Sequence, residues 1–123
     1  MSKLKIIYIR GKPYRHVFFC PGCKTEHFFV AKSADDNTGW NFNGDFDNPT
    51  VTPSILTYPH QVPVGKFRCH CFITNGKVQF LGDCSHELKG QIVELRSDSE
   101  NWAQWIDDQN AEDANKKLDK EAA

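Results

Sequence analysis

The sequence predicts a small, mainly β (α+β) domain of antiparallel strands with one C-terminal helix. Three observations support this fold class. Short runs rich in β-branched and aromatic residues alternate with turn residues, an Asn-Gly pair separates two alternating apolar runs, and a helix-capping pattern precedes the last apolar stripe. At 123 residues, the chain has the length of one domain.

The strands are expected as short segments between turns. The predicted strands are residues 4–10, 14–19, 26–31, 54–58, 67–74, 77–81 and 92–95. Gly11, Lys12 and Pro13 should form the first turn, and Asn75-Gly76 should form a two-residue type I′ hairpin turn. Residues 32–64 are rich in Pro, Asn and Asp and are expected to form a long, aromatic-bearing loop around the short strand at 54–58.

The C-terminal helix is predicted from its capping signal. Ser97 and Glu100 fit a capping box, with Ser97 at the N-cap. An apolar stripe follows at Trp102, Trp105 and Ile106, and it is typical of core packing. Residues 111–123 are mostly polar and are expected to form a fraying tail, which leaves residues 1–110 as a single β-rich domain.

Composition excludes several classes of protein. No run of 18 apolar residues is present, so a membrane span is not expected. The N-terminal segment lacks the apolar region of a secretory signal, which predicts a cytoplasmic protein. Five cysteines without an export signal favour reduced thiols or a metal site over a disulfide framework.

Charge is distributed unevenly along the chain. Residues 1–32 carry seven Lys or Arg against one acid, whereas residues 98–123 carry eight acids against three lysines. Self-complementarity or solvated faces explain this asymmetry most simply. Nucleic-acid binding through the basic segment, with Phe18, Phe28 or Trp40 as stacking surfaces, stays a weaker alternative.

Two separated cysteine pairs predict a zinc site. Cys20 and Cys23 flank Pro-Gly, so both thiolates can face one ion. If the Asn75-Gly76 hairpin continues in register, Cys69 and Cys84 become diagonal neighbours on one face of it. The sequence therefore predicts a zinc-stapled domain whose ion is held by Cys20, Cys23, Cys69 and Cys84.

Other ligand sets remain open. His86 lies two residues beyond Cys84 and could replace it, so the fourth ligand of the ion is either Cys84 or His86. His70 is a further alternative ligand. Cys71 is expected to be a small core residue. His16, His27 and His60 have no partner that the sequence identifies, and we interpret them as surface or structural residues.

One group of polar residues is a candidate catalytic set. His70 and Asp83 lie diagonally on the hairpin face opposite the cysteines, and a carboxylate beside an imidazole can fix its tautomer for general acid–base chemistry. Ser54 is a third candidate, and the alternative is an ordinary cross-strand polar pair.

Several motifs in the middle of the chain form a recognisable pattern. They are Trp40-Asn41-Phe42-Asn43-Gly44, Pro49-Thr50, Thr52-Pro53-Ser54-Ile55, Cys69-His70-x-Phe72 and Phe80-Leu81-Gly82-Asp83-Cys84-Ser85-His86-x-Leu88-x-Gly90-Gln91. Through them the chain, over roughly residues 20–95, resembles a family of small phage and prophage proteins that often carry the label "ammonia monooxygenase". It implies a phage or prophage origin and action in the host cytoplasm. The oxygenase label is not supported, because a thiolate-rich cluster suits zinc rather than copper or iron oxygen chemistry.

Two principal functions follow from these observations. The first is a non-enzymatic, zinc-stapled binding module for a host or phage protein. The second is a zinc-dependent or His-assisted hydrolase in which His70 or His86, with Asp83 and Ser54, lines an open site.

Overall fold

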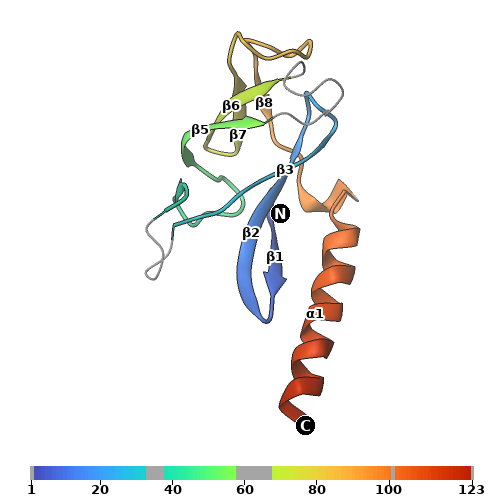
Figure 1. The fold of residues 1–123 in the computed structure, drawn as a ribbon. Coiled ribbons are helices and arrows are strands. Elements are labelled where there is room, and N and C mark those ends of the chain that lie inside the picture. The colour runs from blue at the N-terminus through green and yellow to red at the C-terminus, as the bar shows by residue number, and fades with distance from the viewer. Residues whose placement is uncertain (1, 33–37, 58–67, 101, 123) are drawn as a thin grey trace.

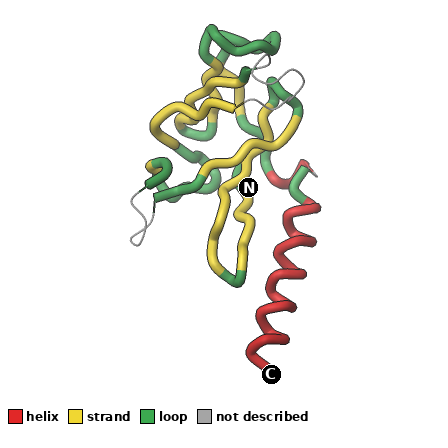
Figure 2. The backbone as a smooth tube through the Cα atoms, viewed as in Figure 1, coloured by secondary structure: helices red, strands yellow, loops and turns green. Residues whose placement is uncertain are grey.

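The computed structural model describes residues 2–32, 38–57, 68–100 and 102–122, and it confirms the predicted fold class. Two antiparallel sheets lie beside one long C-terminal helix (Figure 1 and Figure 2). The first sheet contains, in spatial order, β1 (Lys5–Ile9), β2 (Lys12–Cys20) and β3 (Thr25–Phe29). The second contains β4 (Asn41–Phe42), β5 (Val51–Thr57), β6 (Cys69–Thr74), β7 (Lys77–Phe80) and β8 (Ile92–Glu94).

The first hairpin turns one residue earlier than predicted. Arg10 and Gly11 have φ values of 53° and 76°, so the left-handed pair lies at Arg10-Gly11. Consequently β2 already begins at Lys12 and includes Pro13. Proline is tolerated there because its partner Tyr8 adjoins an irregularity of the register between Ile7 and Tyr8.

The Asn75-Gly76 hairpin is confirmed. Its two turn residues have φ values of 51° and 76°, and Phe72 pairs with Gln79 as predicted. The predicted continuation of the register to Cys84 is wrong, because the ladder ends at the pair Cys71 and Phe80. Leu81 N–H still donates to His70 O, and the chain then turns, with Cys84 N–H donating to Leu81 O. Phe67, which would be opposite Cys84 if the predicted register continued, lies outside the described residues.

The strand predicted at 54–58 is longer at its start. β5 begins at Val51, and its first two residues also pair with β4. No strand is expected from the sequence at the position of β4. The register of β5 against β6 is irregular between Val51 and Ile55, so Pro53 is not required to donate to the ladder. Tyr58, the last predicted residue, lies outside the described residues.

The main core lies between the two sheets. Its fully buried side chains are Leu4, Phe18, Cys20, Phe29, Val51, Cys69, Cys71, Ile73, Val78 and Phe80. Cys71 is therefore a core residue, as predicted. Trp40, Phe42 and Phe46 of the long loop pack against this core, half-buried.

The helix begins later than the capping signal predicts. Residues Asp98–Glu100 form a 3-10 turn, and α1 spans Gln104–Ala122. Trp102 and Ile106 are buried against Ile7 and Val17 of the first sheet, whereas Trp105 is 45% exposed. Neighbouring helical positions point about 100° apart, so Trp105 cannot share the buried face of Ile106. Among the described residues, no helix is long and apolar enough to cross a membrane.

Polar side chains fasten α1 to the first hairpin. Asn110 accepts from Tyr8 N–H at 3.0 Å and donates to Ile6 O at 2.7 Å. The Asp113 carboxylate accepts from the backbone N–H groups of Arg10 and Gly11 at 2.8 and 3.0 Å. The helix continues through the segment predicted to be a tail, to Ala122, and fraying of its end stays a prediction.

Candidate functional site

Strand β6 carries two kinds of chemistry on its two faces. Successive side chains of a strand point to opposite faces, so Cys69 lies in the core while His70 lies on the open face of the second sheet. The polar set predicted on that open face and the metal ligands predicted on the buried face are therefore separate sites that share one strand.

Ser54, His70 and Asp83 form one hydrogen-bonded chain. Ser54 Oγ lies 2.9 Å from His70 Nε2, and His70 Nδ1 lies 3.1 Å from Asp83 Oδ2. A carboxylate can only accept, so Nδ1 carries the proton and Nε2 is left free to accept from the Ser54 hydroxyl. These are the relative positions of nucleophile, base and orienting acid in a Ser-His-Asp triad.

Local structure explains how three distant residues meet. Leu56 pairs with His70 across β5 and β6, which makes Ser54 a diagonal neighbour of His70 on the same face. Trp40 Nε1 donates to the Ser54 carbonyl at 3.3 Å and holds this part of β5. Asp83 reaches His70 from the turn that follows β7.

Asp83 is held in its ionised form. Desolvation opposes this, but the hydrogen bond and the charge of His70 outweigh it and lower the pKa of Asp83. Arg68 Nη1 adds a contact to Asp83 Oδ2 at 3.4 Å, between side chains that are about two-fifths exposed. An ionised carboxylate keeps the imidazole in the tautomer that a general base needs.

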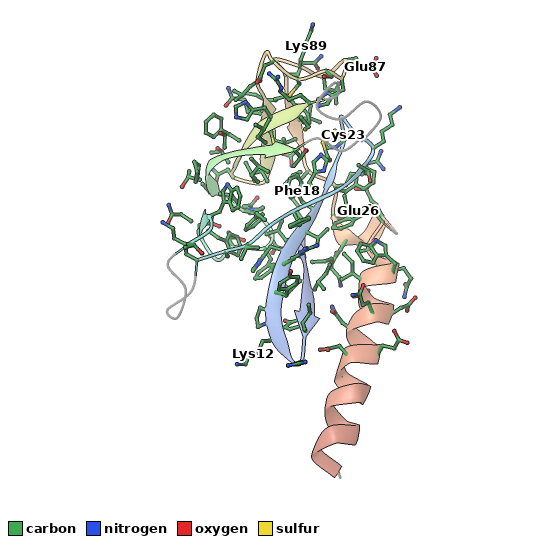
Figure 3. The ribbon with its side chains drawn as sticks, viewed as in Figure 1. Lys12, Phe18, Cys23, Glu26, Glu87 and Lys89 are labelled. Atoms are coloured by element: carbon green, nitrogen blue, oxygen red, sulfur yellow. The ribbon has the colours of Figure 1, made fainter. Side chains whose placement is uncertain are left out.

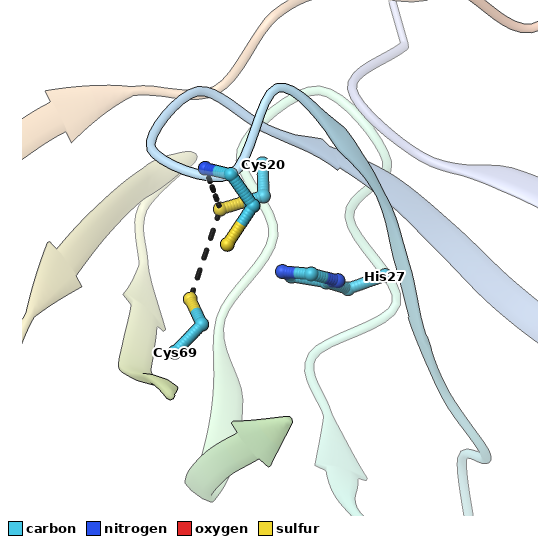
Figure 4. A group of neighbouring side chains, drawn as sticks. Cys20, His27 and Cys69 are labelled. Atoms are coloured by element: carbon cyan, nitrogen blue, oxygen red, sulfur yellow. Dashed lines mark hydrogen bonds between the residues drawn. The ribbon is translucent and has the colours of Figure 1, made fainter. Parts of the chain in front are cut away.

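The buried face holds a cluster of three sulfurs and one imidazole. Ligand atoms of Cys20, Cys23, His27 and Cys69 all lie within 4.8 Å of one another, and all four residues are buried. Figure 4 shows the His27 ring beside the sulfurs, and Figure 3 shows Cys23 beyond the end of β2, past Phe18. Two strands and a tight turn of the first sheet thus supply three ligands, and β6 of the second sheet supplies the fourth.

The spacing and the ionisation of these sulfurs fit a metal ion. Cys20 Sγ and Cys69 Sγ are 3.8 Å apart. Two sulfurs of a tetrahedral zinc site, each about 2.3 Å from the ion, are separated by about 3.8 Å. Hydrogen bonds from Cys23 and Cys69 lower the pKa of Cys20, while the same contacts raise the pKa of Cys23 to about 12 and raise that of Cys69. The close contact therefore favours ionisation of Cys20 and opposes ionisation of the other two thiols. A bound cation would stabilise all three as thiolates.

Cys84 and His86 lie at the margin of this cluster. Together with Cys69 they form a second group of potential ligands, in which His86 Nε2 is 3.6 Å from Cys69 Sγ. The Cys84 sulfur is engaged by the backbone of His70, accepting from its N–H at 3.2 Å and donating to its carbonyl at 3.1 Å. Burial lowers the pKa of His86, which keeps the imidazole neutral, the form that binds metals.

The predicted site residues are thus brought together in two places. Cys20, Cys23 and Cys69 converge, with Cys84 and His86 beside them, and Ser54, His70 and Asp83 converge on the other face. His27, which we interpret from the sequence as a surface or structural residue, instead lies among the potential ligands. The register of β2 and β3 contains the missing signal, because Phe18 pairs with His27 and the alternation then puts His27 on the face of Cys20.

Comparison with known proteins gives one match. No curated protein and no solved structure matches the chain. Residues 2–81 match the family model described as "bacterial ubiquitination-like system serine protease (BubE)". The matched range contains Ser54 and His70 and ends two residues before Asp83. Because this match extends over more than half of the sequence, the chain belongs to the BubE family.

Proposed function

We propose that this protein is a serine protease of a bacterial ubiquitination-like system, with Ser54 as nucleophile, His70 as general base and Asp83 as the residue that orients His70. One observation carries the proposal: Ser54 Oγ, both His70 nitrogens and the Asp83 carboxylate form a continuous chain of contacts between 2.9 and 3.1 Å. The description of the family as serine proteases supports the same chemistry.

The proposed reaction is hydrolysis of a peptide bond in two steps, with His70 moving the proton in each step. As Ser54 Oγ bonds to the carbonyl carbon of the substrate, its proton moves to His70 Nε2. His70 then gives that proton to the leaving nitrogen as the C–N bond breaks, which leaves an acyl group on Ser54. A water molecule, deprotonated by His70, releases the acyl group and restores the serine. Asp83 stays ionised throughout and stabilises the imidazolium.

We further propose that the buried cluster holds one zinc ion, with Cys20, Cys23, Cys69 and His27 as ligands. Zinc bound by four protein side chains supplies folding stability and does not activate water. Four buried ligands of this kind match the three-Cys, one-His type of structural site. Cys84 is a weaker candidate because its sulfur already contacts the His70 backbone.

The triad favours the enzymatic reading of the sequence over the binding module. A purely structural polar pair would explain His70 and Asp83, but it would not explain a serine hydroxyl 2.9 Å from the remaining imidazole nitrogen. The triad and the sulfur cluster face opposite sides of β6, so the hydrolase that we propose is assisted by His70 and not by a metal-bound water.

Covalent labelling tests the assignment directly. The purified protein is treated with a fluorophosphonate, whose phosphorus is attacked by an activated serine with loss of fluoride, and the modified residue is mapped by mass spectrometry. We expect modification at Ser54 and none in Ser54→Ala. His70→Ala should slow labelling by about 10²-fold or more, because the serine loses its general base.

A second serine provides the matched control. Ser2 hydrogen-bonds to Leu4 O, far along the chain from the triad, and Ser2→Ala should label like the wild type. Labelling that is absent from the wild type, or that persists unchanged in Ser54→Ala, would show that Ser54 is not the nucleophile.

A further inference from the structure

Beside the triad lies an apolar groove between the two sheets. It has a volume of about 440 Å³ and is lined by residues of β3 and β5 and by Trp40. The Trp40 indole connects the groove to the triad because it donates to the Ser54 carbonyl. Three of its lining residues are apolar and exposed: Phe28, Val30 and Leu56, which are 46%, 37% and 47% exposed, with the Arg15 guanidinium 4.0 Å from the centre of the Phe28 ring. Three such residues along one groove are more than the scattered exposure that a surface normally shows.

The groove is bordered by an open strand edge. His70 O accepts from Leu81 on the β7 side, so the alternation turns the backbone groups of Cys69 and Cys71 toward β5. Their partners Thr57 and Ile55 therefore face β6, and the N–H and C=O of Leu56 between them face away. No described residue pairs with Leu56 on that side, since β4 reaches only Val51 and Thr52.

We infer that this groove binds the substrate as an extended, unfolded segment of polypeptide with apolar side chains, which pairs with the outward backbone groups of Leu56 in β5. The inference rests on the proposed function and names its substrate class. An extended segment satisfies the outward backbone groups of Leu56, and its alternate side chains reach the apolar lining. Ser54 lies two residues before Leu56 on the same strand and the same face, and its carbonyl already accepts from Trp40 Nε1. A segment paired at Leu56 therefore ends its pairing beside the nucleophile.

Charge further restricts the occupant. Glu26 lines the same groove, and its carboxylate accepts from Thr25 Oγ1 at 3.3 Å. Acidic side chains would meet this carboxylate, so neutral apolar segments are preferred over acidic ones.

Two phosphonate probes separate the groove from the triad. The short probe is an acetylated aminoalkyl diphenyl phosphonate, and the long probe carries the same reactive group after a Leu-Val-Leu segment. We measure the second-order rate constant of Ser54 modification by each probe and compare their ratio. The long probe should react at least about tenfold faster, and an Asp-Ser-Glu segment should give no acceleration.

Variants of the protein and N-methylated probes show which residues and which backbone groups make the long probe react faster. Phe28→Ser and Leu56→Ser should each lower the ratio about threefold to tenfold. Ile92→Ser, which changes an even more exposed apolar residue of β8, should leave the ratio as it is. N-methylation at alternate amides of the long probe should lower the ratio about two- to tenfold, and methylation at the amides between them should matter little, because only every second N–H faces a paired strand.

The outcomes are distinguishable. A ratio near one, or a ratio that Phe28→Ser, Leu56→Ser and Ile92→Ser change equally, overturns the groove as the substrate site while the short probe still reports an active triad. If neither probe modifies Ser54, the proposed function itself fails, and the assignment of the groove fails with it.

Discussion

Removing the metal should unfold this domain rather than alter one step of its chemistry. Three potential ligands of the cluster come from the first sheet and Cys69 comes from the second, so an ion bound there would connect the two sheets. Structural zinc contributes about 10–16 kcal/mol of apparent binding free energy. The net stability of a whole domain is about 5–15 kcal/mol, so the metal-free form is expected to be largely unfolded.

The assay combines metal content with unfolding. Zinc is quantified in the purified protein, and a chelator is then titrated while near-ultraviolet circular dichroism and Trp fluorescence are recorded. Trp102 is a suitable reporter because it is buried and donates from Nε1 to Ser97 O at 2.7 Å. One zinc per chain and a cooperative loss of both signals on chelation are expected.

Two cysteine variants make the test specific. Cys20→Ala should lose the metal and the fold, since it removes one of the four ligands. Cys71→Ala changes an equally buried cysteine on the same face of β6 as Cys69, and it should keep one zinc per chain with a loss of about 1 kcal/mol of stability. A chain that releases its metal and retains its melting temperature, or a Cys20→Ala variant with full metal content, would refute this reasoning.

Three further predictions follow from other parts of the structure. Asp83→Asn should lower the rate of Ser54 labelling about 10²- to 10⁴-fold with little change in melting temperature, because an amide no longer fixes the tautomer of His70; an unchanged rate would remove Asp83 from the triad. Burial lowers the pKa of His16, whose Nδ1 is buried without a hydrogen-bond partner among the described residues, so the unfolded chain binds a proton more readily. The free energy of unfolding should therefore decrease as the pH falls below about 6.5, and His16→Phe, measured by denaturant titration from pH 8 to pH 5, should decrease less steeply. Ile106→Ala should cost about 2–5 kcal/mol by the same titration, whereas Trp105→Ala should cost less than about 1 kcal/mol; equal costs would contradict the orientation of α1.

The parts of the fold that short-range rules determine could be predicted from the sequence. Asn75-Gly76 requires two positive φ values, and this fixes the turn and the register of the strands beside it. From that register, the burial of Cys69, Cys71 and Ile73 and the exposure of the opposite face follow by alternation alone. The prediction fails beyond Phe80, where the chain leaves the ladder, because alternation cannot indicate where pairing stops.

The parts that depend on tertiary contacts could not be predicted in the same way. The start of β5 at Val51 is one such part, because an irregularity of its register against β6 accommodates Pro53 within the strand. The register of β2 and β3 puts His27 on the face of Cys20, but only the approach of Cys69 from the second sheet completes the cluster around it, and no local pattern indicates that approach. The predicted origin in a phage or prophage stays a prediction, since the family match concerns a bacterial system.

The two proposed sites share strand β6, so we expect the proposed catalysis to depend on the proposed metal ion although the ion takes no part in the reaction. Cys69 is followed directly by His70, and Asp83 is followed directly by Cys84, whose sulfur contacts both backbone groups of His70. Adjacent residues of a strand share one backbone, so fixing Cys69 in the cluster also fixes the direction of the His70 ring. A general base must lie within hydrogen-bond reach of its nucleophile, and a displacement of about 1 Å can cost about 10²-fold in rate. We therefore expect the buried cluster to act on Ser54 through the position of His70, and a metal-free chain should lose labelling at Ser54 over the same chelator range in which its tertiary structure is lost.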